Sequence, residues 1–166
     1  RHTRFRNVTG VQTCALPISK REWVLTNGIG GYAMGTASGL NTRRYHGHLI
    51  AATTPPSERM VLLGAIDAFI QVGQTPLGLS ANQYPGAIYP EGFHYLRSFS
   101  VGEAATWCYR AAGMDVRKRL RMHPGVNAVT VEYTNLGKSP FTLTLDRKST
   151  RLNSSHVSES RMPSSA

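Results

Sequence analysis

Apolar and polar residues alternate along the second half of this chain, and this period of two constrains the fold more than any other feature. Between Met114 and Met122, four apolar residues and Lys118 take alternate positions, and the positions between them carry Asp115 and three arginines. Successive side chains of a strand point to opposite faces, so the pattern predicts a strand with one buried face. Lys118 interrupts that face, which predicts a partly exposed strand at a sheet edge.

Similar short runs recur along most of the chain and are separated by residues typical of turns. Hairpin turns are expected at Val72–Thr75 and His123–Val126, and Thr53–Pro56 ends another strand. No segment keeps a helical period for three turns. The expected strands are 22–26, 32–38, 45–52, 60–72, 93–100, 105–111, 114–122, 129–134 and 141–145. Many short strands joined by turns predict an all-β protein, an antiparallel β-sandwich.

The segment from Trp23 to Ala52 concentrates glycines and polar side chains between two apolar runs. Its glycines Gly28, Gly30 and Gly31 follow a strand, which by itself would also suit a dinucleotide-binding loop. No helical pattern follows them, so a glycine-rich β turn is the preferred interpretation.

A cluster of polar residues follows that turn, Arg43-Arg44-Tyr45-His46. Arginine, tyrosine and histidine offer flat side chains with several donors, which suit sugar hydroxyls or anions. The alternative is a solvated strand start whose arginines pair with nearby carboxylates. Neighbouring strand residues face opposite ways, but the sequence does not show which arginine points outward.

The order of residues in this segment resembles a known family. The string TNGIGGYAMGTASGLNTRRYHGHLIAA is similar to the N-terminal domain of bacterial and archaeal glycogen debranching enzymes of the amylo-α-1,6-glucosidase type. Two positions depart from the expected pattern, namely His48 in place of an apolar residue and Gly125-Val126-Asn127 in place of a more polar turn. The resemblance spans roughly residues 21–145 and continues through Tyr84-Pro85-Gly86, Pro90–Phe93, Tyr95-Leu96, Phe99, Thr106–Tyr109 and Arg119–Tyr133.

This resemblance implies a large β-sandwich that precedes an (α/α)6 catalytic barrel. In such enzymes the catalytic carboxylates lie in the barrel, so residues 20–145 are expected to form a non-catalytic accessory domain that acts with that barrel on α-1,6 branches of glycogen. No catalytic residue is therefore assigned. Two other hypotheses stay open: a free-standing glucan-binding module, and the sandwich of a related glucoamylase or disaccharide phosphorylase.

Five residues are candidates for contact with glucan or with the catalytic domain: Arg43, Arg44, Tyr45, His46 and Tyr84. Tyr84 belongs to a segment rich in proline and glycine that is expected to be a long loop, and loops on a rigid scaffold commonly carry binding. Trp23, Trp107 and Tyr95 are expected in the core more often than on a sugar, and the arginines of 117–121 are expected on a solvated face.

Both ends of the chain carry segments that do not resemble a natural domain. Val8–Ile18 and Asp146–His156 can each be back-translated to one strand of the same sequencing-library adapter. Our hypothesis is that residues 1–19 and 146–166 are translated adapter on a metagenomic fragment, and irregular tails are expected there. Such segments are excluded before the fold is considered.

This exclusion changes the composition from which a function class is inferred. The whole chain has a net charge of +10, but residues 20–145 hold 12 Lys and Arg against 7 Asp and Glu, a net charge of +5. A nucleic-acid partner is therefore not expected. Only Cys108 remains outside the tails, which gives no disulfide framework and fits a cytoplasmic protein. No metal site, cofactor, membrane segment or export signal is expected, since His46 and His48 alone are a weak zinc pattern.

Overall fold

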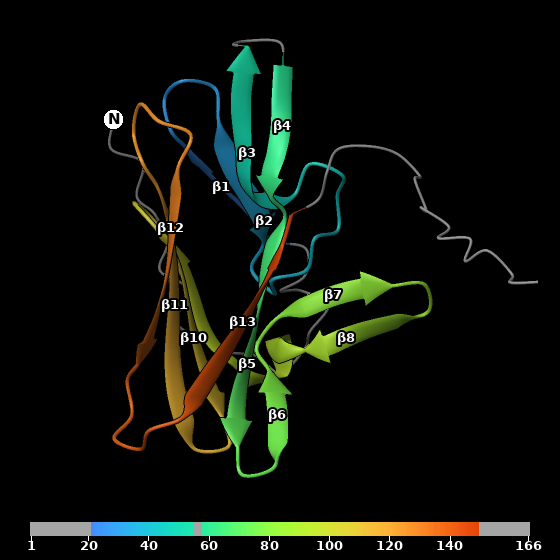
Figure 1. Cartoon of the computed structure of the whole chain (residues 1–166), viewed down its shortest axis with the longest axis vertical. Coiled ribbons are helices and arrows are strands. Elements are labelled where there is room, and N and C mark those ends of the chain that lie inside the picture. Colours follow the sequence, from blue (N-terminus) through green and yellow to red (C-terminus); the bar gives the residue numbers. More distant parts are fainter. Residues whose placement is uncertain (1–20, 55–57, 150–166) are drawn as a thin grey trace, which may run out of the picture.

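The computed structural model describes residues 21–54 and 58–149 of the chain, and Figure 1 shows their arrangement. Residues 1–19 and 150–166, which we interpreted as adapter sequence, lie outside the described residues. The described residues form four antiparallel sheets and one short 3-10 helix. The expected all-β sandwich is confirmed.

The first sheet has the order β1-β2-β3-β4 and contains β1 (Glu22–Thr26), β2 (Tyr32–Thr36), β3 (Gly47–Thr54) and β4 (Glu58–Leu63). Its outer strand β1 buries Trp23 and Leu25 and exposes the residues between them, as the alternation predicts. Residues 47–52 of β3 are all buried, including His48 and Leu49, so this inner strand is covered on both faces.

The second sheet has the order β12-β11-β10-β9 and contains β9 (Leu96–Val101), β10 (Ala105–Ala111), β11 (Met114–Met122) and β12 (Val129–Asn135). Strands β10 and β11 match their predicted ranges. Val116, Leu120 and Met122 are buried on the inner face of β11, and Arg119 and Arg121 are exposed on the outer face. The outer face is solvated at these two arginines, whereas Arg117 is half-buried and its Nε is buried without a hydrogen-bond partner among the described residues.

A third sheet and a hairpin complete the fold. The sheet has the order β13-β5-β6, with β5 (Ala65–Val72), β6 (Thr75–Gly78) and β13 (Thr142–Lys148). The hairpin pairs β7 (Ala81–Tyr84) with β8 (Ala87–Glu91), and η1 (Gly92–Tyr95) connects it to β9. Figure 1 shows the hairpin projecting sideways from the body of the molecule.

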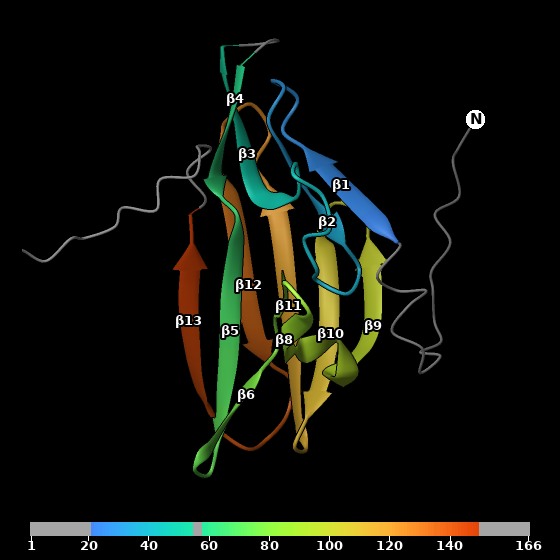
Figure 2. The same ribbon diagram turned by 90° about the vertical axis from the view of Figure 1, so that its right-hand side faces the viewer.

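The layers of the sandwich are easiest to follow in two views. Figures 1 and 2 show the β12-β9 sheet as one layer, with the β1-β4 sheet against one end of it and the β13-β5-β6 sheet against the other. A single residue, Gly64, separates β4 from β5, so the chain passes directly between these two sheets. Their inner faces share one core, in which Trp23 contacts Trp107 edge to face at 5.3 Å between ring centroids.

Three expectations about strands need correction. The run 60–72 is two strands, because the chain changes sheet at Gly64. The segment around Tyr84, expected as a loop, contains β7 and β8, and Phe93–Tyr95 lie in a 3-10 helix rather than at the start of a strand. Proline and glycine weaken the strand pattern in a sequence, yet a short hairpin tolerates both.

The last strand continues past the boundary expected after Leu145. Strand β13 pairs with β5 as far as Lys148, which lies opposite Ala65, and this includes Asp146 and Arg147. Phe141 and Leu143 pack against the core as the alternation predicts, whereas Leu145 is half exposed. The division of the chain at residue 145 stays a prediction.

Candidate functional site

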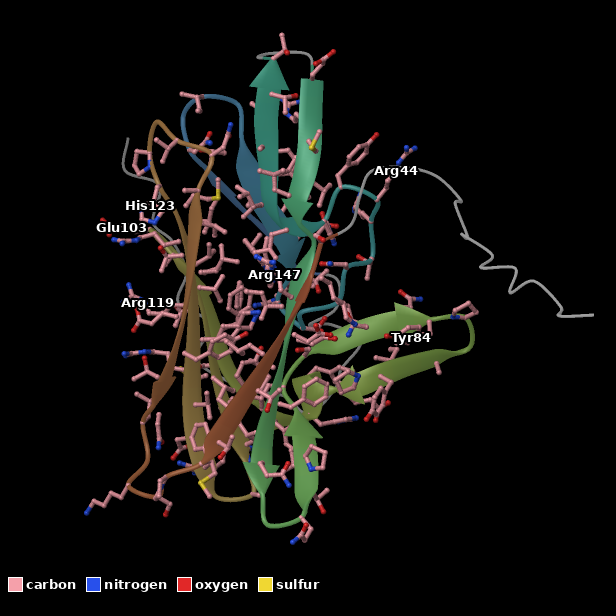
Figure 3. All side chains as sticks on the ribbon, viewed as in Figure 1. Arg44, Tyr84, Glu103, Arg119, His123 and Arg147 are labelled. Carbon is pink, nitrogen blue, oxygen red and sulfur yellow. The ribbon has the colours of Figure 1, made fainter. Side chains whose placement is uncertain are left out.

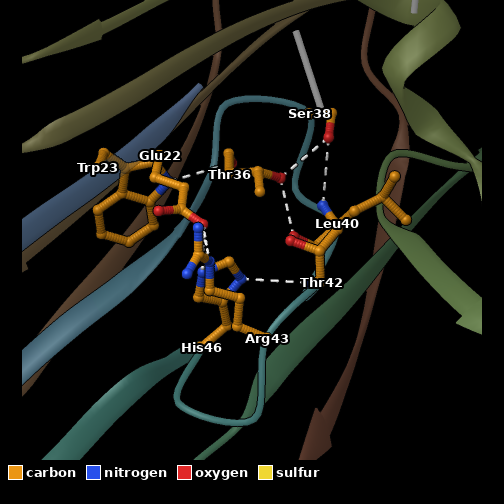
Figure 4. A network of polar contacts seen from close by, with 8 residues as sticks. All are labelled: Glu22, Trp23, Thr36, Ser38, Leu40, Thr42, Arg43 and His46. Atoms are coloured by element: carbon orange, nitrogen blue, oxygen red, sulfur yellow. Dashed lines mark hydrogen bonds and ion pairs between the residues drawn. The ribbon is translucent and has the colours of Figure 1, made fainter. Parts of the chain in front are cut away.

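The segment between β2 and β3 folds as a loop that is tied to the core from several sides (Figure 4). The Thr36 hydroxyl donates to the Leu40 carbonyl at 2.8 Å and lies 2.9 Å from the Ser38 hydroxyl. The two core tryptophans hold the start of the loop, since the indole N–H of Trp23 donates to the Thr36 carbonyl and that of Trp107 donates to the Ala37 carbonyl. Buried polar groups with partners give this loop one well-defined path.

His46 fixes the end of the loop. Its side chain is buried, and its Nδ1 accepts a hydrogen bond from the Thr42 backbone N–H at 3.1 Å. An accepting Nδ1 places the ring proton on Nε2, which lies 3.4 Å from a carboxylate oxygen of Glu22. Burial lowers the pKa of His46, although the Glu22 carboxylate acts in the opposite direction. His46 is therefore a neutral, structural residue and is not exposed for ligand contact.

The two arginines of the cluster differ in their surroundings. Arg43 pairs with Glu22, so the alternative of an arginine bound to a nearby carboxylate describes this residue. Arg44 and Tyr45 form the turn at the tip of the loop, where Tyr45 is 63% exposed and Arg44 is exposed. Within residues 21–54 and 58–149, Arg44 has no ion-pair partner. All three of these residues are exposed, but Arg43 is held by Glu22, whereas Arg44 and Tyr45 project from the tip of the loop.

The glycine turn between β1 and β2 is structural. Gly28 and Gly30 have φ angles of +80° and +94°, which favour glycine. A Cβ at Gly31 would lie 2.5 Å from the Asn27 side-chain nitrogen, so any larger residue would displace that side chain. The turn joins two antiparallel strands and has no following helix, which excludes the dinucleotide-binding interpretation.

Asn27 connects this turn to two distant segments. Its side-chain oxygen accepts from the backbone N–H groups of Ile29 and Gly31, and its nitrogen donates to the Val126 carbonyl and to Asn127 Oδ1. Asn127 also bonds both backbone groups of Ala52 at the end of β3. We name Asn27 and Asn127 the asparagine clamp. Sequence reasoning predicted a hairpin turn at His123–Val126 and noted residues 125–127 as a departure from the family pattern, but it missed the connection of this turn to the glycines.

Tyr84 lies at the end of β7 in the projecting hairpin and is 47% exposed. Tyr89 of β8 is 66% exposed and lies in the irregular part of the hairpin, between the pairs Gln83–Ile88 and Ala81–Glu91. By contrast, Trp23 and Trp107 are buried and Tyr95 packs against the core, as expected for these three. Tyr84 and Tyr89 are the aromatic groups of this region that a sugar ring could stack on.

Figure 3 shows how the exposed candidates lie relative to the sandwich. Arg44, at the loop tip, and Tyr84, in the hairpin, lie on one side of the molecule, and Arg119, Glu103 and His123 lie on the other. Forty residues separate Arg44 from Tyr84 in the sequence. The fold therefore places the loop and the hairpin on a common side, which no spacing in the sequence could indicate.

Between the loop and the hairpin lies a polar pocket. Gly39 of the loop and Asn82 of the hairpin line it, together with residues of both layers: His48, Ala65, Ile66, Asp67, Ala68, Leu79, Ser80, Ala81, Tyr109, Lys118 and Tyr133. Its volume is about 20 Å³. The buried Asp67 carboxylate accepts two hydrogen bonds from the Asn82 amide, at 2.9 and 3.0 Å, and pairs with Lys148 Nζ at 2.6 Å. We refer to this region as the lysine pocket.

Lys118 faces the interior at this pocket, so the sheet-edge prediction was wrong. Strand β11 is paired on both sides, with β10 and β12, and the Lys118 ammonium lies 5.1 Å from the Trp107 ring centroid and 5.9 Å from that of Tyr133. Burial lowers the pKa of Lys118 to about 8, and the Asp67 carboxylate opposes this shift. Aromatic faces and a nearby carboxylate explain how an ammonium is accommodated inside the sandwich.

The buried carboxylate of Asp67 is already engaged by Asn82 and Lys148. In residues 21–54 and 58–149, no group of three or more His, Cys, Asp or Glu side chains could hold a metal ion. Over the same residues, no helix has the length and apolar character of a membrane span. Cys108 is half-buried on β10.

Comparison with known proteins adds to this geometry. The profile of a family described as "Glycogen debranching enzyme N terminal" matches residues 21–162, a range that includes every described strand. No curated protein and no solved structure matches the chain significantly. The glycine turn, the pinned loop and the paired strands lie within the matched residues, and the resemblance noted in the sequence is confirmed. The chain belongs to the family of glycogen debranching enzyme N-terminal domains.

Proposed function

We propose that this chain is an accessory, non-catalytic domain of a cytoplasmic enzyme that removes α-1,6 branches from glycogen, and that its loop and hairpin contact the glucan beside the active site of a separate (α/α)6 catalytic domain. Family membership supports the type of parent enzyme. The glucan contact is supported by the position of Arg44 and Tyr84 on one side of the molecule and by the exposure of Tyr45 next to Arg44.

The observation that carries this proposal is the division of roles within the cluster 43–46. His46 is buried and Arg43, although exposed, is paired with Glu22, whereas Arg44 and Tyr45 are exposed at the tip of a loop that the core holds in place. A guanidinium can donate two hydrogen bonds to neighbouring hydroxyls, and a tyrosine ring can cover the apolar face of a pyranose. A rigid support reduces the entropy lost when these side chains bind.

Affinity electrophoresis of the full chain in gels that contain glycogen tests the glucan contact. We expect retardation of the wild-type protein that is reduced at least threefold in Arg44→Ala, Tyr45→Ala and Tyr84→Ala. The matched control is Arg119→Ala, an exposed arginine on the opposite side of the molecule, which should leave retardation unchanged. Equal loss in Arg119→Ala would mean that net charge rather than this side of the molecule drives binding.

A wild-type chain that glycogen does not retard would contradict direct glucan contact. The same residues would then be candidates for contact with the catalytic domain. That role predicts that Arg44→Ala and Tyr45→Ala weaken association with a separately produced catalytic barrel of this family, whereas Arg119→Ala does not.

The exposed hairpin favours a second candidate function, a free-standing glucan-binding module. Tyr84 and Tyr89 are both exposed on a hairpin that projects from the sandwich, an arrangement that needs no second domain to present a stacking surface. Adding the catalytic barrel distinguishes the two functions. An accessory domain should raise the activity of the barrel on branched glucan, and a free-standing module should bind glycogen without changing that activity.

A further inference from the structure

The lysine pocket contains two buried polar atoms that the protein does not satisfy. Nδ1 of His48 and the hydroxyl of Tyr133 are both buried, and neither has a hydrogen-bond partner among the described residues. Both side chains line the pocket, His48 from β3 and Tyr133 from β12. A buried polar group without a partner destabilises the fold, so most such groups in proteins are bonded to protein or to ordered water.

Charged groups surround these two atoms. Lys118 of β11 lies over the rings of Trp107 and Tyr133, and Asp67 of β5 binds Asn82 and Lys148. No hydrogen bond or ion pair joins the Lys118 ammonium to the Asp67 carboxylate, although each affects the other electrostatically. The pocket therefore offers donors at Lys118 and Tyr133 and acceptors at Asp67 and His48 Nδ1.

Size restricts what can occupy such a pocket. A cavity needs roughly 10–15 Å³ of accessible space to hold one water molecule, and an internal water makes about three hydrogen bonds. The lysine pocket has a volume of about 20 Å³, which is enough for a water molecule. It is also polar on several sides, whereas cavities that stay empty are apolar.

We propose that the lysine pocket is a binding site for a single internal water molecule, which donates to His48 Nδ1, accepts from the Tyr133 hydroxyl and bridges Lys118 toward Asp67. This water connects the two layers of the sandwich, since His48 and Asp67 come from one layer and Tyr133 and Lys118 from the other. It lies where Gly39 of the loop and Asn82 of the hairpin reach the core. The site does not depend on the proposed glucan contact.

A monovalent anion such as chloride is the main competitor, because it is similar in size and Lys118 would attract it. The Asp67 carboxylate disfavours an anion at the same place, since like charges repel in a poorly solvated site. A crystal structure of the full chain at a resolution that shows ordered water tests both. We expect one density peak within about 3.2 Å of both His48 Nδ1 and Tyr133 Oη. Crystals grown with bromide in place of chloride should show no anomalous peak there.

An anomalous peak at this position would overturn the proposal in favour of an anion site. An empty pocket, or a direct hydrogen bond between His48 and Tyr133, would overturn it as well.

NMR supplies a second measurement that needs no crystal. Protons of a long-lived internal water should show cross-relaxation with amide protons beside the pocket, such as that of Ala68, in the wild-type chain. We expect this signal to be lost in Tyr133→Phe, which removes one of the two hydrogen-bonding groups and keeps the ring under Lys118. Tyr89→Phe, which removes an exposed hydroxyl outside the pocket, is the matched control and should retain it. Absence of the signal in the folded wild type would contradict a bound water.

Discussion

The asparagine clamp and the lysine pocket are both buried polar regions that hold distant segments together, yet they are built from different chemistry. The clamp uses two neutral amides, and the groups of Asn27 have partners within the protein. The lysine pocket uses an ammonium, a carboxylate, an imidazole and a phenol, and two of its atoms lack protein partners. Since only the second set can gain or lose protons, the two regions should respond differently to pH.

This difference indicates how each region contributes to folding. Satisfied amides stabilise one arrangement of the turns at any pH between acid and alkaline denaturation. Buried ionisable groups impose a cost that depends on their charge, so they stabilise the fold only in the protonation state that suits the interior. The contrast can be tested by removing a member of each region and measuring the free energy of unfolding over a range of pH.

Removal of the clamp should have the largest effect. Asn27→Ala deletes four side-chain hydrogen bonds and leaves the Gly31 amide without its buried partner, so we expect a loss of about 3 kcal/mol in the free energy of unfolding. Urea denaturation followed by circular dichroism measures it. The loss should be equal at pH 5.5 and pH 7.5, because no ionisable group is removed.

Asn135→Ala is the matched control for this prediction. Asn135 also bonds two backbone groups of a turn, Ser139 and Gly137, but it is exposed, and its loss should cost no more than about 1 kcal/mol. Equal free energies of unfolding for the two alanine variants would mean that burial does not increase the contribution of the clamp. The contrast drawn between the two regions would then be wrong.

Acidification should have the next largest effect, acting through the lysine pocket. Burial lowers the pKa of His48 well below its ordinary value of 6.5, and the Lys118 charge lowers it further. The unfolded chain therefore binds more protons below pH 6.5, and stability should fall by up to about 1.4 kcal/mol per pH unit as the pH decreases. His46, whose pKa is also lowered, adds to the loss. Urea midpoints at pH 7.5, 6.5 and 5.5 measure this dependence.

His48→Leu separates the two histidines. The variant should retain only the part of the acid dependence that His46 causes, whatever its stability at neutral pH. An unchanged slope in a folded His48→Leu protein would show that the pocket histidine does not titrate in this range.

Lys118→Met should change stability less. A folded-state pKa of about 8, below the 10.5 of an unfolded lysine, means that the charged amine disfavours the fold at pH 7 and that wild-type stability rises between pH 8 and pH 10. Methionine removes that cost and keeps the hydrophobic stem, while Asp67 stays paired with Lys148. We expect a gain of about 1 kcal/mol at pH 7 and loss of the rise above pH 8. Destabilisation at pH 7 would instead mean that the ammonium contacts stabilise the pocket.

Arg43→Ala should have the smallest effect, because Arg43 lies outside both buried regions. Its guanidinium is 65% exposed, and exposed ion pairs contribute about 0.2–1 kcal/mol that salt weakens. Thermal unfolding in low and high salt measures this contribution. A larger loss would place the pair of Arg43 and Glu22 among the groups that hold the loop, beside His46.

The sequence predicted strands correctly where one face of the strand is buried and the other is exposed. The ranges of β1, β10 and β11 follow from alternation, because each of these strands buries one side against the same core. The glycine turn was also predicted, since positive φ angles favour glycine. Trp23 and Trp107 were expected in the core because large aromatic side chains on the strands of a sandwich are usually buried, and both are buried.

Other features depend on contacts between distant segments, which a single sequence does not contain. The partners of Asn27 lie about a hundred residues away, so nothing near Asn27 indicates a clamp. Lys118 and His48 both interrupt apolar faces. Lys118 is accommodated by Trp107 and Tyr133 of the neighbouring strands of its own sheet, and His48 lines the same polar pocket from the other layer. The common side of Arg44 and Tyr84 likewise required the fold. The roles of these two residues stay predictions.

The contact between Trp23 and Trp107 gives the protein an internal optical probe. One indole belongs to each layer of the sandwich, and each is buried and donates its N–H to a fixed carbonyl. Their emission should therefore be shifted to short wavelength, and their edge-to-face geometry should couple their transitions in near-ultraviolet circular dichroism. Because both signals require the layers to be in contact, a change in either one reports separation of the two sheets before the strands themselves are lost.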